Sequence, residues 1–333
     1  MVAVRRAGSD PEEAVRSMAL QKSRRSFFTH LGLGAASLLT LKGRERMAKG
    51  QTAARDLHLA CGEYPWTVFY RRENRDFRSV LDAGLGEIAK AGFDGYEPLV
   101  EAPAELDQLG PLLEKHALEM RSLYVNSYLH DANQAEASID LVLSIAERAK
   151  ALGTKLIVTN PKPIQWSGTE NKDDSQLEVQ AAALNRLGGE LKRLGLTLTY
   201  HNHDMELREA ARELHHMLLA TDPELVTFCM DAHWIYRGAG NSSVALFDIL
   251  KLYGSRTTEL HIRQSDNQIW SESFGDGDID YPRMVEGFIN MNTRPHLVME
   301  QAIEDESPHT MNAFEAHRKS AQSARRVFQS LAG

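Results

Sequence analysis

The chain has 333 residues, of which 25% are charged and 42% hydrophobic, and its formal net charge is -8. This is the composition of an ordinary globular protein with enough apolar material for one large core. Because the charge is negative and no run rich in Lys and Arg lies beyond residue 50, neither a nucleic-acid surface nor an anionic-membrane surface is expected. The two cysteines, Cys61 and Cys229, lie in apolar strand patterns. We expect them to be buried free thiols, since two distant core positions rarely meet disulfide geometry.

Residues 1–54 are set apart from the rest of the chain, and we expect an export leader there. Arg24 and Arg25 precede a mildly apolar run, residues 31–41, which is too short to span a bilayer. Paired arginines ahead of such a run are typical of a twin-arginine signal; the alternative is a basic amphipathic first helix. Export predicts recognition by the twin-arginine machinery, a periplasmic or extracellular location, and no stable membrane insertion.

Strand and helix patterns alternate over residues 55–333. Eight strand candidates spaced about 25 to 40 residues apart match the repeat of a (β/α)8 barrel. Gly92, Gly153 and Gly195 each follow a predicted helix and precede a predicted strand, as helix C-caps do. We therefore predict an α/β protein with a single (β/α)8 TIM barrel, preceded by the export signal. The predicted strands are 57–61, 94–97, 120–125, 156–159, 197–201, 226–231, 259–263 and 296–300, and the predicted helices include 80–91, 135–152, 177–194, 207–220, 244–253 and 313–331.

Residues that bind metals or transfer protons lie at the ends of the last four predicted strands. These residues are His201, Asp231, His261 and Glu300, in chain order. The carboxyl ends of the strands of a parallel barrel meet at one mouth, where active sites lie. Each residue also has an ordinary explanation: a solvated turn capped by Asp204, a helix cap for Asp231, or a satisfied core histidine for His261. Four in succession favour a metal site.

Two imidazoles and two carboxylates suit one divalent transition ion, Mn, Co, Zn or Fe, better than Ca or Mg. Among these four ions, manganese is the one we favour. Such an ion polarises a carbonyl and an adjacent hydroxyl, so that a base can remove a neighbouring proton to give a metal-held enediolate. Reprotonation then isomerises or epimerises the sugar, whereas expulsion of a β-oxygen makes the enzyme a lyase. The acid and base candidates are Glu300, His203, Glu206 and His233.

Aromatic residues favour a sugar as the ligand, because each of the four tryptophans lies just after a predicted strand. Aromatic faces pack well on the apolar faces of sugar rings. The alternative for Trp66 and Trp234 is packing at the top of the barrel. The sequence has no glycine-rich phosphate cradle after its last two strands and few cations there, so we expect an unphosphorylated sugar. The predicted substrate-binding residues are Glu97, Trp66, His130, Trp234, Arg263 and Trp270.

Four motifs in their expected order resemble the xylose isomerase-like superfamily, commonly described as sugar phosphate isomerase/epimerase. They are Tyr-His-Asn-His-Asp-Met-Glu at 200–206, Met-Asp-Ala-His-Trp at 230–234, Leu-His-Ile-Arg at 260–263 and Phe-Gly-Asp-Gly-Asp-Ile-Asp at 274–280. The resemblance covers about residues 55–331 and includes ketose 3-epimerases and inosose dehydratase. It implies that the metal ligands are His201, Asp231, His261 and Glu300.

The sequence departs from the ketose 3-epimerases at two places. Those relatives have a glutamate where this chain has His201, and the usual Lys-Asp after the strand-seven histidine is Arg263-Gln264. Since a ligand imidazole cannot also act as the base, we keep two reactions open. The first is isomerase/epimerase chemistry on an unphosphorylated sugar or keto-sugar. The second is β-elimination from a keto-sugar, an inosose or a 3-keto-glycoside. A sugar-binding barrel without turnover is a third alternative, while endonuclease IV shares the fold but resembles this chain poorly.

Replacing Arg24 and Arg25 together with lysine tests export. The change keeps the positive charge and removes the arginine pair that the export machinery recognises. We expect the variant to accumulate in the cytoplasm with its leader uncleaved, as measured by cell fractionation and immunoblotting. A control with Arg44 and Arg46 changed to lysine should be exported like the wild type. Equal export of the two variants would contradict the twin-arginine interpretation.

Overall fold

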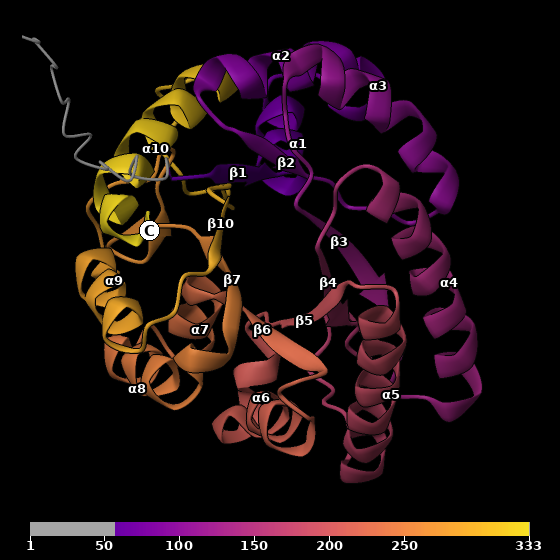
Figure 1. The fold of residues 1–333 in the computed structure, drawn as a ribbon. Coiled ribbons are helices and arrows are strands. Elements are labelled where there is room, and N and C mark those ends of the chain that lie inside the picture. Colours follow the sequence, from indigo (N-terminus) through magenta and orange to yellow (C-terminus); the bar gives the residue numbers. More distant parts are fainter. Residues whose placement is uncertain (1–56, 333) are drawn as a thin grey trace, which may run out of the picture. The chain divides into compact units, whose positions relative to one another are not determined.

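Eight parallel strands form one sheet with helices around it in the computed structural model, which describes residues 57–332 (Figure 1). The strand order in this sheet is β2-β1-β10-β7-β6-β5-β4-β3. Parallel bridges join Gly95 to Glu119 and Leu99 to Tyr124, so the two end strands β2 and β3 also meet. The predicted single (β/α)8 barrel is therefore confirmed, while the predicted leader at 1–54 lies outside the described residues.

The barrel strands overlap all eight predicted strands, and the bounds differ by at most two residues. A short antiparallel hairpin follows the seventh barrel strand. The barrel strands are β1 (Leu59–Gly62), β2 (Gly95–Glu97), β3 (Ser122–Ser127), β4 (Leu156–Pro161), β5 (Thr197–His201), β6 (Val226–Asp231), β7 (Thr257–Ile262) and β10 (His296–Met299), and the hairpin strands are β8 (Ser265–Asp266) and β9 (Ile269–Trp270).

Within residues 57–332, ten α-helices follow or connect these strands, and the helices predicted from periodicity are all among them. The sequence patterns did not single out four of them: α1, which begins directly after β1, α3, which contains Pro111, α7 and α9. Over residues 57–332, no helix is both long enough and apolar enough to cross a membrane. The helices are α1 (Glu63–Arg72), α2 (Leu81–Ala91), α3 (Leu106–His116), α4 (Ala132–Ala151), α5 (Asp174–Arg193), α6 (Arg208–Ala220), α7 (Ala232–Gly238), α8 (Ser243–Tyr253), α9 (Tyr281–Asn290) and α10 (Ala313–Phe328).

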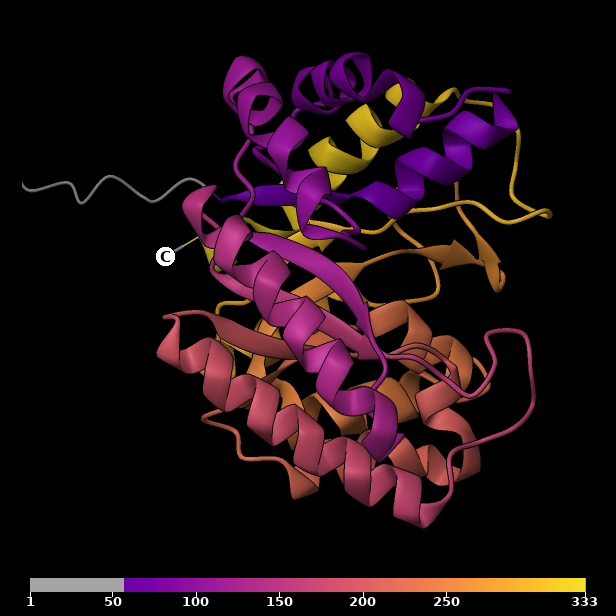
Figure 2. The same ribbon diagram turned by 90° about the vertical axis from the view of Figure 1, so that its right-hand side faces the viewer.

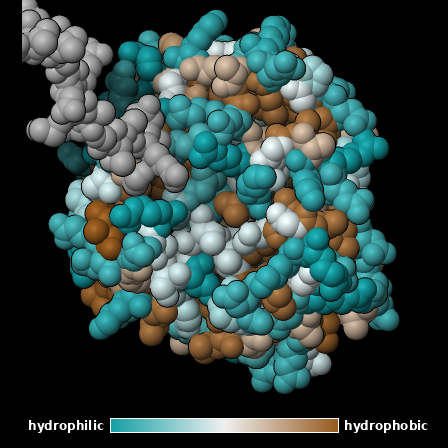
Figure 3. Space-filling model, viewed as in Figure 1, coloured by the Kyte–Doolittle hydropathy of each residue, from teal (hydrophilic) through white to brown (hydrophobic). Residues whose placement is uncertain are grey.

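The core has an apolar layer between the strands and the helices, whereas the barrel interior contains polar side chains. Leu198, Phe228 and Leu260 are fully buried, and both cysteines are buried free thiols, as predicted. Glu97 and Glu259 are also buried. The outer face in Figure 3 is mainly hydrophilic, with hydrophobic residues in small separate groups. Figure 2 shows α1 and the β8–β9 hairpin together on its right-hand side, so the segments that follow strand ends gather at one end of the barrel.

The close packing of α5 on the segment before β6 depends on a glycine. A Cβ atom on Gly188 would lie 2.3 Å from the Leu225 carbonyl oxygen, whereas a Cβ on the next residue, Gly189, would meet nothing within 4 Å. A backbone carbonyl cannot rotate away as the end of a side chain can. Gly188 therefore sets the distance between this helix and the barrel.

The neighbouring glycines of α5 make a matched pair of stability tests. We expect Gly188→Ala to destabilise the protein by about 1–3 kcal/mol, because the methyl group overpacks against Leu225. Gly189→Ala should stabilise it by about 0.5–1 kcal/mol, because alanine favours the helix and meets no neighbour. Urea unfolding followed by circular dichroism measures both changes. Equal effects of the two substitutions would show that α5 packs differently.

Candidate functional site

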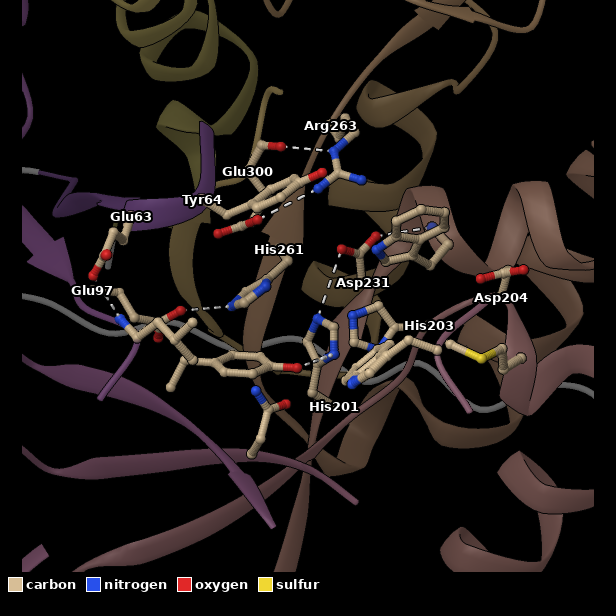
Figure 4. A pocket seen from close by; sticks show the side chains of 16 residues that line it. Glu63, Tyr64, Glu97, His201, His203, Asp204, Asp231, His261, Arg263 and Glu300 are labelled. Carbon is tan, nitrogen blue, oxygen red and sulfur yellow. Dashed lines mark hydrogen bonds and ion pairs between the residues drawn. The ribbon is translucent and has the colours of Figure 1, made fainter. Parts of the chain in front are cut away.

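A cavity of about 380 Å³ lies at the carboxyl ends of the barrel strands. All four predicted metal ligands line it, together with His203, Trp234, Arg263 and Glu97 from the other predicted sets. Figure 4 shows the labelled side chains pointing toward a common space, with His261 between Glu97 and Asp231. Residues that the sequence did not single out as site residues also line the cavity: Glu63, Tyr64, Leu99, Tyr124, Asn126, Trp166, Asp204 and Met205.

The parallel strands bring the predicted ligands to the same end of the barrel. His201 and Asp231 are the last residues of β5 and β6, and Asp231 pairs with His261 of β7. Glu300 directly follows β10. His201 Nε2 lies 3.7 Å from Asp231 Oδ2. Residues separated by up to 99 positions in the chain, from 201 to 300, are therefore neighbours in the cavity.

Asp231 has both roles that its sequence position suggested, because it caps a helix and also offers an oxygen to the cavity. Its Oδ1 accepts a hydrogen bond from the Trp234 N–H at 2.9 Å and caps α7, while its buried Oδ2 has no hydrogen-bond partner in the described part of the chain. Burial alone would raise the pKa of Asp231, but the neighbouring His201 and the charge of Arg263 hold that pKa well below its usual range. The free oxygen thus belongs to an ionised carboxylate, which suits a cation.

Glu300 occupies space that a glycine leaves open. A Cβ atom on Gly62, at the end of β1, would lie 1.8 Å from Glu300 Oε1. Arg263 holds the residue from the other side: its Nε donates to the Glu300 carbonyl at 2.7 Å, and its Nη2 lies 3.4 Å from Oε2. Burial raises the pKa of Glu300 to about 7, although the charges of His261 and Arg263 act in the opposite direction.

His261 lies between two buried carboxylates. Its Nε2 is 3.0 Å from Glu259 Oε1 and 3.2 Å from Glu97 Oε1. Burial disfavours the imidazolium, but the neighbouring acidic groups raise the pKa of His261 above its usual value. Burial and the charge of Glu97 raise the pKa of Glu259, whereas the pKa of Glu97 falls to about 2 because His261, against the effect of burial, stabilises its charged form.

The donor atoms fall into two compact groups within residues 57–332, and both groups include His261. One group is Glu97, His261 and Glu300; the other is His201, Cys229 and His261. The predicted set of His201, Asp231, His261 and Glu300 lines one cavity but does not form a single compact group of this kind. The free Asp231 oxygen, the room beside Gly62 and the nitrogen and oxygen donors nonetheless fit a divalent ion.

His203 and Glu206, both predicted to move protons, have different positions. The His203 ring lines the cavity, 4.8 Å from the His201 ring. Burial lowers the pKa of His203 to about 4, so its imidazole is neutral near pH 7. Glu206 is buried outside the cavity lining, where its Oε2 accepts from the His203 N–H at 2.7 Å and its Oε1 accepts from Asn160 Nδ2 at 3.1 Å. Glu206 thus holds the His203 backbone instead of facing the cavity.

His233 also lies outside the cavity, contrary to its predicted catalytic position. Its ring is fully buried, and Nε2 lies 3.0 Å from Ser265 Oγ. Trp270 is similarly removed from the predicted substrate wall, because it lies under the Arg263 guanidinium, whose Cζ is 4.2 Å from its ring centroid. Both residues support Arg263 and the β8–β9 hairpin from behind.

Trp66 and His130 do not reach the cavity. Trp66 is 0% exposed within α1, where its Nε1 donates to Cys61 Sγ at 3.1 Å and its ring stacks on His317 at 4.1 Å. The packing alternative is therefore right for Trp66. His130 is buried against Tyr128, with ring centroids 4.6 Å apart. Helix and loop packing, which the sequence pattern does not reveal, turns both side chains away from the mouth.

Two exposed aromatic residues stand at the rim of the cavity. Tyr64 is 49% exposed and Trp166 is 46% exposed, and both line the opening. The Trp166 ring makes an edge contact with His203 at 5.2 Å. Its loop is held in place by Arg208, which donates to the Gly168 carbonyl at 3.0 Å. An exposed tryptophan in a fastened loop is a suitable platform for the face of a sugar ring.

The family model described as xylose isomerase-like TIM barrel matches residues 85–327. The chain belongs to this family. Its relatives include an inosose dehydratase of Clostridium perfringens strain 13, which is 24% identical over 251 residues, covering 67% of this chain and 82% of that protein.

Two solved structures share the fold. A sugar phosphate isomerase/epimerase from Parabacteroides distasonis ATCC 8503 has a TM-score of 0.64 and 18% identity, covering 85% of this chain and 97% of that one. A xylose isomerase-like TIM barrel protein from Mycobacterium smegmatis in complex with magnesium has a TM-score of 0.63 and 10% identity, covering 84% and 98%. The proteins that this chain resembles thus include a dehydratase by sequence and an isomerase/epimerase by fold.

Gly62→Ala should lower metal affinity without unfolding the protein. The added Cβ displaces the Glu300 carboxylate, and disturbing the surroundings of a ligand typically costs about 10- to 100-fold in affinity. Calorimetric titration with Mn²⁺ measures the change. Gly275→Ala is the control, because a Cβ there meets nothing within 4 Å. If Gly62→Ala binds Mn²⁺ as tightly as this control does, Glu300 is not a ligand.

Proposed function

We propose that the protein is a divalent-metal-dependent enzyme of the sugar isomerase/epimerase type, acting on an unphosphorylated sugar or keto-sugar. The observation that carries this proposal is the ionised Asp231 carboxylate, whose buried Oδ2 has no hydrogen-bond partner in residues 57–332. It lies in one cavity with two imidazoles and the Glu300 carboxylate. Membership of a family that includes sugar-transforming enzymes supports the same conclusion.

His201, Asp231, His261 and Glu300 are the residues that would hold the ion, with Glu97 close enough to His261 to take part. When bound, a divalent ion polarises the substrate carbonyl and its adjacent hydroxyl, which makes the neighbouring C–H group acidic. The mixed nitrogen and oxygen donors favour a transition ion, with manganese first. The fold relative from Mycobacterium smegmatis was solved with magnesium, which is compatible with a divalent-ion site.

Glu300 and His203 are the proposed proton-transfer groups. Without a bound ion, burial raises the pKa of Glu300 to about 7, and a pKa near the working pH suits a general base. His203 is neutral near pH 7 because burial lowers its pKa to about 4. Glu300 follows β10 and His203 follows β5, so they reach the substrate from different walls. One group can remove a proton and the other can return it, as epimerisation requires.

Lyase chemistry is the second candidate, and the inosose dehydratase relative favours it. β-Elimination from a keto-sugar, an inosose or a 3-keto-glycoside starts with the same proton removal. It then needs an acid beside the leaving oxygen instead of a base on the opposite face. A ligand role for His201 leaves Glu300 without a symmetrical carboxylate partner at that position. The same cavity can therefore support either outcome.

The rim and walls of the cavity would bind the sugar. Trp234 and Trp166 offer aromatic faces beside His203. Arg263 Nη1 is buried and has no hydrogen-bond partner in the described chain, so it can donate to a substrate oxygen. We place the enzyme outside the cytoplasm, a part of the proposal that rests on Arg24 and Arg25 alone.

Incubation of the Mn²⁺-loaded enzyme with ketohexoses, inosose and a 3-keto-glucoside in deuterated water tests the reaction. Mass spectrometry and NMR of the products distinguish the alternatives. Deuterium in an intact isomeric sugar supports the isomerase/epimerase assignment. Release of aglycone, or of water with an unsaturated keto-sugar, supports the lyase. Binding of these sugars without any proton exchange would identify a sugar-binding barrel and contradict both.

Glu300→Gln provides the matched variant for that assay. Removing the base should slow exchange by about 10²- to 10⁴-fold, whereas Glu206→Gln should reduce it less, because Glu206 holds the His203 backbone from outside the cavity. Rates are compared at saturating Mn²⁺, so that weaker metal binding does not mimic loss of the base. Unchanged exchange by Glu300→Gln would remove Glu300 from the proton-transfer step.

A further inference from the structure

A thiol lies beneath the floor of the cavity, next to two of the proposed ligands. Cys229 is 0% exposed in β6 and pairs in register with His201 of β5 and Glu259 of β7. Its Sγ and one ring nitrogen each of His201 and His261 all lie within 4.8 Å of one another. The two imidazoles line the cavity, whereas Cys229 does not. The thiol therefore faces the same imidazoles from inside the barrel.

We propose that Cys229, His201 and His261 form a second, inner metal site for a soft or borderline ion such as Zn²⁺ or Cd²⁺. Thiolate and imidazole ligands select such ions, whereas carboxylates select harder ones. The inner and outer sites share both imidazoles, so they cannot be filled independently. The chain therefore offers two overlapping donor sets of different softness, one with a sulfur ligand and one with carboxylates.

The geometry of the inner group is close to that of a zinc site. Ligand atoms of a tetrahedral Zn²⁺ lie about 3.3–3.6 Å apart, given typical Zn–N and Zn–S bond lengths. The three atoms here lie within 4.8 Å of one another, so closure requires movements of about 1 Å or less, which side-chain rotation can supply. Glu259 Oε1 lies 3.0 Å from His261 Nε2 and 3.6 Å from Cys229 Sγ, and it is the candidate for the fourth ligand.

Formation of the S–metal bond replaces the S–H bond, and the thiol proton passes to solvent together with any proton held by the His261 imidazole and the Glu259 carboxyl group. A thiol that coordinates such an ion is deprotonated by it. The thiolate and a carboxylate from Glu259 together balance the charge of a divalent ion, so the ion and these two ligands carry no net charge. This compensation is what burial of an ion requires.

The consequence for activity rests on the proposed function, although the inner site itself does not. An ion held by Cys229 occupies His201 and His261 and withdraws them from the outer set. Zn²⁺ and Cd²⁺ should therefore inhibit the Mn²⁺-loaded enzyme, and removal of the thiol should relieve that inhibition. The other buried cysteine, Cys61, is the matched control, because its sulfur contacts Trp66 Nε1 at 3.1 Å and belongs to neither compact donor group.

Titration of the metal-free, full-length protein with Cd²⁺ or Co²⁺ tests the inner site through its thiolate-to-metal charge-transfer absorption. We expect one equivalent of ion to produce the band in the wild type and in Cys61→Ser, and no band in Cys229→Ser. Soft-ion affinity should fall by at least about 100-fold in Cys229→Ser, as loss of one ligand predicts. Mn²⁺ affinity should stay within about threefold of the wild type, since a hard ion depends little on sulfur.

Cys229→Ala, checked by circular dichroism and Mn²⁺ binding, repeats the test if the serine variant folds poorly. Absence of the band in the wild type, or its persistence without Cys229, would overturn the inner site. Loss of the band in Cys61→Ser alone would assign the band to Cys61, and this result would also overturn the inner site. These spectra do not depend on turnover, so a failed exchange assay with an intact Cys229-dependent band would reject the proposed function and leave the inner site standing.

Discussion

Burial of ionisable groups inside a closed barrel is the constraint on which this site depends. An isolated charge in the barrel interior costs several kcal/mol. His261, Glu97 and Glu259 are stable there only because both carboxyl groups contact the His261 ring, at 3.2 and 3.0 Å. The closed parallel sheet provides these contacts by placing residues of β2 and β7 in one interior. A cation at the mouth would compensate a further buried charge, because it would contact the Asp231 Oδ2 atom, which has no hydrogen-bond partner in the described chain.

The residues around the proposed metal ligands form two groups. Some face the cavity, and others hold the cavity residues in position from behind. Arg263 connects the two groups: it anchors Glu300 and lies over the rings of Trp270 and Trp234. Glu206 fixes the His203 backbone in a similar way from outside the cavity. Residues of one short motif can therefore serve either purpose, depending on whether they point into the barrel mouth or behind it.

Local pattern was sufficient for the barrel and for the strand ends. Buried parallel strands give short apolar runs, and surface helices give 3.6-residue periodicity, so the strands were placed to within two residues. The ends of parallel strands must meet at one mouth, which is why His201, Asp231, His261 and Glu300 could be expected in one cavity. The alternation of side chains along β7 also points Glu259 to the same face as His261, so the sequence contains a signal for Glu259 as well.

The sequence by itself determined the order of the barrel strands, the buried thiols and the four strand-end residues, because these follow from local periodicity and from the topology of a parallel barrel. Only the tertiary structure decided which donors group together, because the grouping around His261 depends on the register between strands that are distant in the chain. It likewise decided that Trp66 packs on His317 of α10, since a tryptophan after a strand can point toward the mouth or toward a neighbouring helix. Barrel closure and helix packing determine the direction of the side chain, and neither can be recognised from a local pattern in the sequence.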